Sequence, residues 1–162
     1  MTEPIPSAPR RRKRIRLPLE RYADEGSIWH ITLVIAHRQP VLDNGPLALE
    51  LVQSLRIACS NGGANLLLFC VMGNHLHAVD QVLDADLISI IRNYKSFSTR
   101  IWWTHGGTGA LWQRSAYDRG VRGEAYLDQV LRYVFENPIS EERIGEMIAA
   151  GTMGGRWLEG SG

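Results

Sequence analysis

The sequence predicts an α+β domain of the split βαβ, ferredoxin-like kind: an antiparallel sheet with helices packed on one face, followed by a further C-terminal helix. Three observations support this prediction. Strand-like and helix-like segments follow one another in the order β-α-β-β-α-β before the last helix, a tight turn joins the second and third strands, and 162 residues suffice for one domain with its own core. At 44% hydrophobic and 22% charged residues, the composition favours a globular chain over a disordered one.

The first strand and the first helix follow from residue type and spacing. Residues 28–35 (IWHITLVI) are rich in β-branched and aromatic side chains, which favours a buried strand. The segment Asn44-Gly45-Pro46 then begins a helix, because proline is favoured in the first turn. Apolar residues recur at helical spacing from Leu47 onward, and Asn61-Gly62-Gly63 ends the helix.

A hairpin is predicted next. Residues 66–72 (LLLFCVM) and 75–79 (HLHAV) form its strands, and Gly73-Asn74 is a two-residue turn whose leading glycine suits a type II′ conformation. A second helix is expected from about residue 85 to residue 103, and an irregular fourth strand over 111–122 (LWQRSAYDRGVR). The last helix follows residue 123 and ends at Asn137, because Pro138 disfavours helical geometry in the residue before it.

Positive charge is concentrated near the N-terminus. The formal net charge is +1, but residues 10–16 (RRRKRIR) hold six of the 18 basic residues, which leaves 12 basic against 17 acidic residues elsewhere. We therefore predict a disordered basic arm over 1–20, a folded domain over 21–144 and a C-terminal tail over 145–162. The arm is expected to add affinity for a phosphate backbone through its six cations: Arg10, Arg11, Arg12, Lys13, Arg14 and Arg16.

The sequence carries no signal for a membrane or a secretory pathway. No apolar run approaches the length of a membrane span, and no apolar segment of a signal peptide follows the basic residues. Two cysteines, Cys59 and Cys70, make no disulfide framework. We expect a protein of the reducing cytoplasm that does not associate with membranes.

Two histidines in the third strand are the first candidates for chemistry. On a strand, positions i and i+2 point to the same face, so His75 and His77 can share one metal ion at the surface of the sheet, while Leu76 points to the helices. Taken alone, so short a pattern is more often two unrelated surface or core histidines. The pattern H-x-H-x-D-H is not met, since Val79 occupies the place of its aspartate. An amidohydrolase barrel needs a far longer chain.

A structural zinc site is a further alternative. In the predicted hairpin Cys70 lies across from His77 and shares its face, so a zinc ion with His75, His77 and Cys70 as ligands is an alternative. Four ligands are needed to close such a site and no fourth is evident, which favours Cys70 as a small buried apolar residue.

The last helix carries the second pair of candidates. Four residues advance a helix by about 400°, so Tyr133 and Asn137 lie roughly 40° apart and one turn from each other, beside the apolar stripe. The alternative is a half-buried tyrosine and a helix-ending asparagine. Together with the histidines, however, the pair suits attack on a phosphodiester: a tyrosine can form a covalent phosphotyrosine, and a neutral set of two His and one Asn leaves Mg²⁺ or Mn²⁺ charged and open to phosphate.

The segments around these residues resemble a known family. VMGNHLH at 71–77 is similar to the HUH motif (His, bulky hydrophobic, His) of single-tyrosine transposases, WQRSAYDRGVR at 112–122 to the segment before their catalytic helix, and LRYVFENPIS at 131–140 to their Tyr-x-x-x-Asn-Pro signature. The match runs from about Ile28 to Ile144 and is closest to the REP-associated tyrosine transposases of the small bacterial insertion-sequence type.

This resemblance implies an HUH transposase-like domain over 21–144. It implies that Tyr133 is the nucleophile, that His75, His77 and Asn137 bind the metal ion, and that the enzyme nicks and rejoins single-stranded DNA near the feet of imperfect hairpins. Relatives with Gln in place of the Asn form dimers with exchanged helices, so Asn137 favours a monomer. Gly73 stands where the family usually has Pro, and the tail after Trp157 matches no family motif, which leaves the hairpin sequence and the way it is recognised undetermined.

Three further cations are candidate phosphate contacts. Arg92 and Lys95 recur at helical spacing on the second helix, where a solvated polar face is the alternative, and Arg114 precedes the fourth strand. Two other functions compete with the enzyme: a domesticated, catalytically silent DNA-hairpin-binding protein, and a single-stranded RNA binder on the same sheet. The first is disfavoured because all four chemical residues are present. The second is disfavoured because the first and third strands lack the exposed aromatic pairs of such domains.

Overall fold

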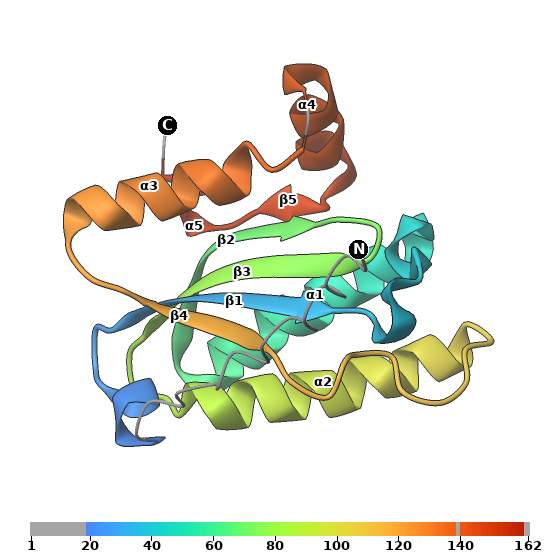
Figure 1. Ribbon diagram of the computed structural model, residues 1–162, viewed down its shortest axis with the longest axis horizontal. Helices are drawn as coiled ribbons and strands as arrows, with labels where there is room; N and C mark the ends of the chain where they lie inside the picture. The colour runs from blue at the N-terminus through green and yellow to red at the C-terminus, as the bar shows by residue number, and fades with distance from the viewer. Residues whose placement is uncertain (1–18, 139, 161–162) are drawn as a thin grey trace, which may run out of the picture.

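The computed structural model of the protein describes residues 19–138 and 140–160. Five strands form one antiparallel sheet (Figure 1). Their order across the sheet is β4 (Tyr117–Val121), β1 (Ile28–Val34), β3 (His75–Val82), β2 (Ala64–Val71) and β5 (Met153–Gly154). The first four strands have the ferredoxin-like order, so the predicted fold class is confirmed.

Helices cover both faces of this sheet. In Figure 1, α1 (Gly45–Gly62) and α2 (Leu87–Thr104) lie below the strands, and α3 (Glu124–Phe135) and α4 (Glu141–Ala150) lie above them. The predicted C-terminal helix therefore packs on the face opposite the first two helices. The shorter elements are α5 (Arg156–Glu159) and the 3-10 segments η1 (Leu19–Ala23), η2 (Ala36–Arg38) and η3 (Val41–Asp43).

Side-chain caps fix where these helices begin. Asn44 accepts a hydrogen bond from the backbone N–H of Leu47 at the start of α1, and Asp86 accepts one from Ile88 at the start of α2. Gly63 ends α1 in the left-handed conformation (φ 83°), as the sequence predicts. Because successive side chains of a strand point to opposite sides, the sheet has two apolar faces.

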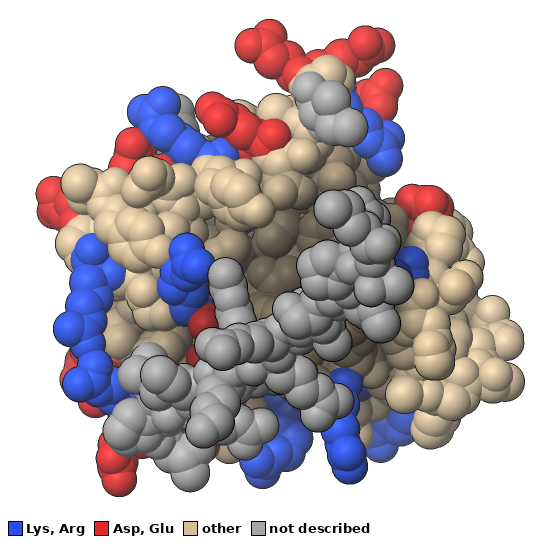
Figure 2. All heavy atoms as spheres, viewed as in Figure 1, with Lys and Arg blue, Asp and Glu red and all other residues tan. Residues whose placement is uncertain are grey.

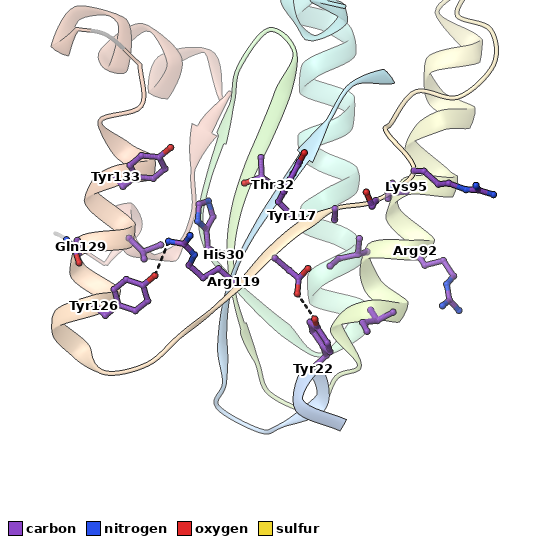
Figure 3. Close-up of a pocket in the computed structure, with 17 residues that line it drawn as sticks. Tyr22, His30, Thr32, Arg92, Lys95, Tyr117, Arg119, Tyr126, Gln129 and Tyr133 are labelled. Carbon is purple, nitrogen blue, oxygen red and sulfur yellow. Dashed lines mark hydrogen bonds between the residues drawn. The ribbon is translucent and has the colours of Figure 1, made fainter. Parts of the chain in front are cut away.

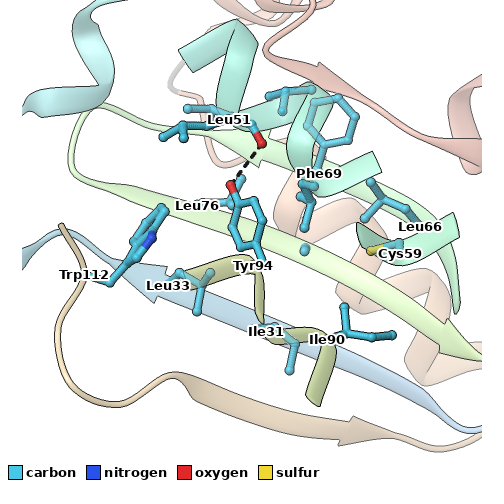
Figure 4. Close-up of a cluster of buried hydrophobic side chains, with 14 of the residues drawn as sticks. Ile31, Leu33, Leu51, Cys59, Leu66, Phe69, Leu76, Ile90, Tyr94 and Trp112 are labelled. Atoms are coloured by element: carbon cyan, nitrogen blue, oxygen red, sulfur yellow. Dashed lines mark hydrogen bonds between the residues drawn. The ribbon is translucent and has the colours of Figure 1, made fainter. Parts of the chain in front are cut away.

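Each face of the sheet buries its own core. The larger one lies against α1 and α2 (Figure 4), where the hydroxyl of Tyr94 donates to the carbonyl of Leu51 at 3.1 Å and Trp112 Nε1 donates to Ser98 Oγ at 2.8 Å. The second core joins Leu68, Cys70 and Val79 of the sheet to α3 and α4. This second cluster holds α3 in place beside the histidines of β3.

The hairpin between β2 and β3 confirms one prediction and corrects another. Met72 N–H donates to the carbonyl of His75, so Gly73-Asn74 is the predicted two-residue turn. The predicted type II′ conformation is wrong, because that turn requires a positive φ at its first central residue and Gly73 does not have one. A Cβ on Gly73 would lie 2.6 Å from Asp43 Oδ1, so a larger residue at this position would require the exposed Asp43 side chain to move. The Gly73 carbonyl accepts from Leu42 N–H.

Three boundaries differ from the sequence-based ones. β4 covers only 117–121 of the strand expected over 111–122, with an isolated bridge between Ile35 and Trp112. α3 ends at Phe135, so Asn137 follows the helix instead of closing it. The boundary placed after residue 144 falls inside α4, and Met147 and Met153 pack in the second core.

In the part of the chain that the structure describes, none of the helices is both long and apolar enough to cross a membrane.

Asp80 is a buried acid whose protonation should govern stability. It is 3% exposed, accepts a hydrogen bond from Cys59 Sγ at 3.3 Å, and burial raises its pKa to about 7, although the bond from Cys59 acts in the opposite direction. The folded chain thus binds this proton more tightly than the unfolded chain, whose aspartate has a pKa near 4. Protonated Asp80 therefore contributes on the order of 4 kcal/mol to the free energy of unfolding. This contribution is complete below about pH 4 and is lost as the pH rises to about 7.

We therefore expect Asp80→Asn to remove most of this pH dependence, because the amide mimics the protonated acid. Urea unfolding between pH 4 and pH 8 measures it, with exposed Asp84→Asn as the control. Equal slopes of unfolding free energy against pH in the wild type and in Asp80→Asn would contradict this assignment.

Candidate functional site

The two predicted histidines lie on the face of β3 that α3 covers. Across the ladder His75 pairs with Val34 of β1, and His77 pairs with Thr32. The rings of the two histidines are 4.8 Å apart between centroids, so they do form one cluster. His77 is only 5% exposed, however, and is not at the surface as expected, because α3 and the neighbouring strands close over it.

The two nitrogens of His77 differ. Its Nδ1 is 3.0 Å from His30 Nε2 and 3.2 Å from Thr32 Oγ1. Its Nε2 is buried and has no hydrogen-bond partner among the described residues. A buried polar atom without a partner is uncommon and calls for an explanation such as a bound ion or water.

The surroundings keep all three histidines neutral at pH 7. Burial lowers the pKa of His77 to about 3, helped by the neighbouring His30 and His75, and burial with the charge of Arg119 lowers the pKa of His30 to about 4. The pKa of His75 is lowered by burial and by Arg38, while its hydrogen bond with Asn137 acts in the opposite direction. Neutral imidazoles have the lone pair that metal binding requires.

Tyr133 joins this cluster from α3. Its ring centroid lies 6.1 Å from that of His77 and 6.2 Å from that of His30, and 58% of the residue is exposed. Asn137, two residues after the end of α3, reaches His75 through its side chain. The fold thus brings together the four residues to which the sequence assigned the chemistry, from segments about 60 residues apart.

A cavity of about 1080 Å³ opens beside Tyr133. Tyr126, Gln129 and Tyr133 form its α3 wall, and Figure 3 shows them facing β1, β4 and α2 across it. On the face of the molecule seen in Figure 2, Lys and Arg side chains lie along the lower edge, over α2, whereas Asp and Glu side chains gather at the top, over α4. A cavity with cations and tyrosines on its walls suits a nucleic-acid strand better than a cationic ligand.

The predicted phosphate contacts line this cavity. Arg92, Lys95 and Arg114 are all among its lining residues. Lys95 Nζ donates to the carbonyl of Gln113 at 2.7 Å, and in Figure 3 Arg92 and Lys95 extend from α2 away from His30 and Tyr133. Arg92 and Lys95 are therefore on the far side of the cavity from His30 and Tyr133. The six cations of the predicted arm, Arg10 to Arg16, lie outside the described residues.

Sequence reasoning missed His30 and Arg119. Both line the cavity, and they face each other across the β1–β4 ladder. A signal was present: His30 and Thr32 are two residues apart on a predicted strand, so one face of that strand is polar. The sequence does not give the register between β1 and β3, which places this face beside His77.

The donor set suits a divalent metal ion. The free Nε2 of His77 is an available ligand atom, and His75 and the Asn137 amide stand beside it. No group of three or more His, Cys, Asp or Glu within 19–138 and 140–160 is arranged to hold a metal ion, so an amide would have to complete the set. The described residues do not support the zinc alternative, because Cys70 is buried and forms no group with His75 and His77 that could hold a metal ion.

Comparison with known proteins agrees with this arrangement. The chain belongs to the IS200-like transposases, since the model of that family matches residues 25–137. The expected class, an enzyme that nicks and joins DNA, is thereby confirmed at the level of the family. A search of curated proteins found no significant match.

Two solved structures share the fold. One is a REP-associated tyrosine transposase bound to a REP hairpin, 18% identical, with a TM-score of 0.60 over 71% of this chain and 68% of that one. The other is a putative transposase from Deinococcus radiodurans, 21% identical, with a TM-score of 0.50 over 68% of this chain and 88% of that one. At these identities the likeness concerns the fold.

Proposed function

We propose that this chain nicks and rejoins single-stranded DNA at hairpins through a 5′-phosphotyrosine on Tyr133, with Mg²⁺ or Mn²⁺ held by His75, His77 and Asn137. One observation carries the proposal. An exposed tyrosine of α3 stands about 6 Å, ring to ring, from a buried histidine whose Nε2 lacks a partner. Because 58% of Tyr133 is exposed, the residue is accessible to a bound strand.

The proposed reaction conserves the phosphodiester energy. Tyr133 Oη attacks the phosphorus and loses its proton, the new P–O bond forms as the P–O3′ bond breaks, and the 3′-oxygen of the cut strand gains a proton. A second 3′-hydroxyl can reverse these steps and reseal the strand without ATP. The bound ion supplies charge neutralisation at a non-bridging phosphate oxygen. His75, His77 and Asn137 are neutral ligands and leave that positive charge undiminished.

The cavity supplies a place for the strand next to the scissile phosphate. Arg119 lies on the β4 side, Arg92, Lys95 and Arg114 lie on the α2 side, and Tyr117 and Tyr126 offer rings on which bases can stack. We propose that the DNA is an imperfect hairpin, in line with the REP hairpin held by the structurally similar transposase. We further propose that the enzyme works in the cytoplasm and as a monomer, since the chain's own α3 carries Tyr133 to its own histidines.

The test is a covalent adduct. Purified protein is incubated with a 5′- or 3′-labelled library of imperfect hairpins and Mn²⁺, and then denatured before electrophoresis. We expect the 3′ label to migrate with the protein, because the fragment downstream of the cut keeps the 5′-phosphate that joins Tyr133, whereas the 5′-labelled fragment leaves with a free 3′-hydroxyl. The 3′ label should be released when a strand with a 3′-hydroxyl is added. Hairpin binding without any adduct would support the domesticated, catalytically silent binding protein instead.

Deletion of residues 1–16 tests the basic arm. We expect weaker binding to all DNA and a shallower slope of log K against log[salt], by up to a few units at roughly 0.7 to 0.9 per lost phosphate contact. The choice of hairpin should not change, because phosphate contacts carry no base information. Binding measured by fluorescence anisotropy at several salt concentrations decides this; an unchanged slope would mean that the arm makes no phosphate contacts.

A further inference from the structure

The environment of His77 distinguishes its two ring nitrogens. Nδ1 has two neighbours at hydrogen-bond distance, His30 Nε2 at 3.0 Å and Thr32 Oγ1 at 3.2 Å, while Nε2 has none among the described residues. A neutral imidazole carries its single proton on one nitrogen and a lone pair on the other. The groups around Nδ1 therefore decide whether Nε2 can act as a ligand.

We propose that His30 is a positioning residue: it accepts a hydrogen bond from His77 Nδ1 and so holds His77 in the tautomer whose Nε2 lone pair is free for a divalent ion. The inference rests on the proposed function for the role of His77 as a ligand. In proteins a ligating histidine almost always donates its other N–H to a carboxylate, a carbonyl or water, which fixes the ring and its tautomer. Here a second imidazole takes the place of that acceptor.

The sheet register puts His30 where this requires it. Thr32 is directly opposite His77, and His30 is two residues along the same face of β1. The two imidazoles are tilted by 35° with centroids 5.2 Å apart, so they meet through ring nitrogens and are not stacked. On its other side His30 pairs with Arg119 across the β1–β4 ladder.

Burial disfavours the alternative, in which His30 Nε2 carries the proton and donates to His77 Nδ1. It would place the proton of His77 on Nε2, a buried N–H without an acceptor, and such orphaned donors are rare in folded proteins. With the proton on Nδ1 of His77, the remaining proton of His30 belongs to a ring that lines the cavity, where solvent can accept it. The hydroxyl of Thr32 can donate or accept and thus fits either arrangement. The assignment therefore depends on His30.

The tautomer can be observed directly. Long-range ¹H–¹⁵N correlation spectra of the full-length, metal-free protein at pH 7 distinguish protonated from unprotonated ring nitrogens, and the His77→Gln and His30→Phe spectra assign the signals. We expect the wild type to show His77 with Nδ1 protonated and Nε2 unprotonated. A wild-type His77 that carries its proton on Nε2 would overturn the proposal without any further variant.

Two substitutions separate the acceptor from the shape of the ring. His30→Phe keeps most of the ring volume but has no acceptor, so the His77 tautomers should mix and Mn²⁺ affinity should fall by about tenfold to a hundredfold. His30→Glu offers an acceptor only, so it should keep the wild-type tautomer and bind Mn²⁺ at least as tightly. Calorimetric titration with Mn²⁺ alone measures both, with His105→Phe, remote from the site, as the control.

An unchanged tautomer and unchanged Mn²⁺ affinity in His30→Phe would overturn the proposal, as would a His30→Glu variant as weak as His30→Phe. None of these measurements uses DNA. A wild type that binds Mn²⁺ but forms no covalent DNA adduct would sink the proposed reaction and leave the role of His30 intact.

Discussion

Tyr133→Phe is expected to abolish the covalent DNA adduct while hairpin binding stays within a few-fold of the wild type. The substitution removes one hydroxyl, and the exposed ring at the edge of the second core keeps its contacts. Because phenylalanine has no hydroxyl to form the phosphotyrosine, the adduct should fall below detection, whereas removal of a binding contact causes only a partial loss. Adduct formation on a labelled hairpin and anisotropy titration with the same DNA measure the two effects.

Tyr126→Phe is the matched control. Tyr126 lies two turns earlier on α3, lines the same cavity and is hydrogen-bonded to Arg119 Nη1 at 3.4 Å. It has no ring contact with the histidines, so its loss should leave the adduct yield near that of the wild type. An adduct that survives in Tyr133→Phe and disappears in Tyr126→Phe would move the nucleophile to Tyr126.

Removal of the divalent ion should be the second large effect. We expect EDTA to stop cleavage and Mg²⁺ or Mn²⁺ to restore it, because several kcal/mol of stabilisation at the phosphate, roughly a thousandfold in rate, are attributed to the ion. His75→Ala should lose activity to a similar degree. Since His75 is only half-buried, the melting temperature of the His75→Ala variant should differ little from that of the wild type.

His77→Ala should differ from His75→Ala in stability. His77 is buried and hydrogen-bonded to His30 and Thr32, so its removal leaves a cavity and unpaired groups at a cost of about 1–3 kcal/mol. Its thermal melt should therefore shift to lower temperature, while activity is lost in both variants. His105→Ala, which loses only a surface pair with Glu50, is the control for both. Cleavage by the wild type in excess EDTA would contradict the role of the ion.

The local pattern of the sequence was enough for most of the fold and for the choice of candidate site residues. Strand composition, the helix start at residues 44–46 and the two-residue turn are properties of neighbouring residues, and the structure has all of them. The i, i+2 spacing of His75 and His77 set both rings on one face of β3 because side chains alternate along any strand. The family motifs added the pairing of these histidines with Tyr133, and the rings do lie close together.

Only the tertiary structure decided what surrounds those groups. Spacing along one strand says nothing about which strand lies beside it, so the partnership of His30 with His77 depended on the β1–β3 register. Spacing also cannot tell how deeply a face is covered. His77 is buried because α3 packs over it, and α3 is held by a core that includes Met147 and Met153, from a region that the sequence suggested was a tail. The sequence determined which chemical groups this protein has, and long-range packing decided their exposure and their hydrogen bonds. Those depend on contacts between residues far apart in the chain.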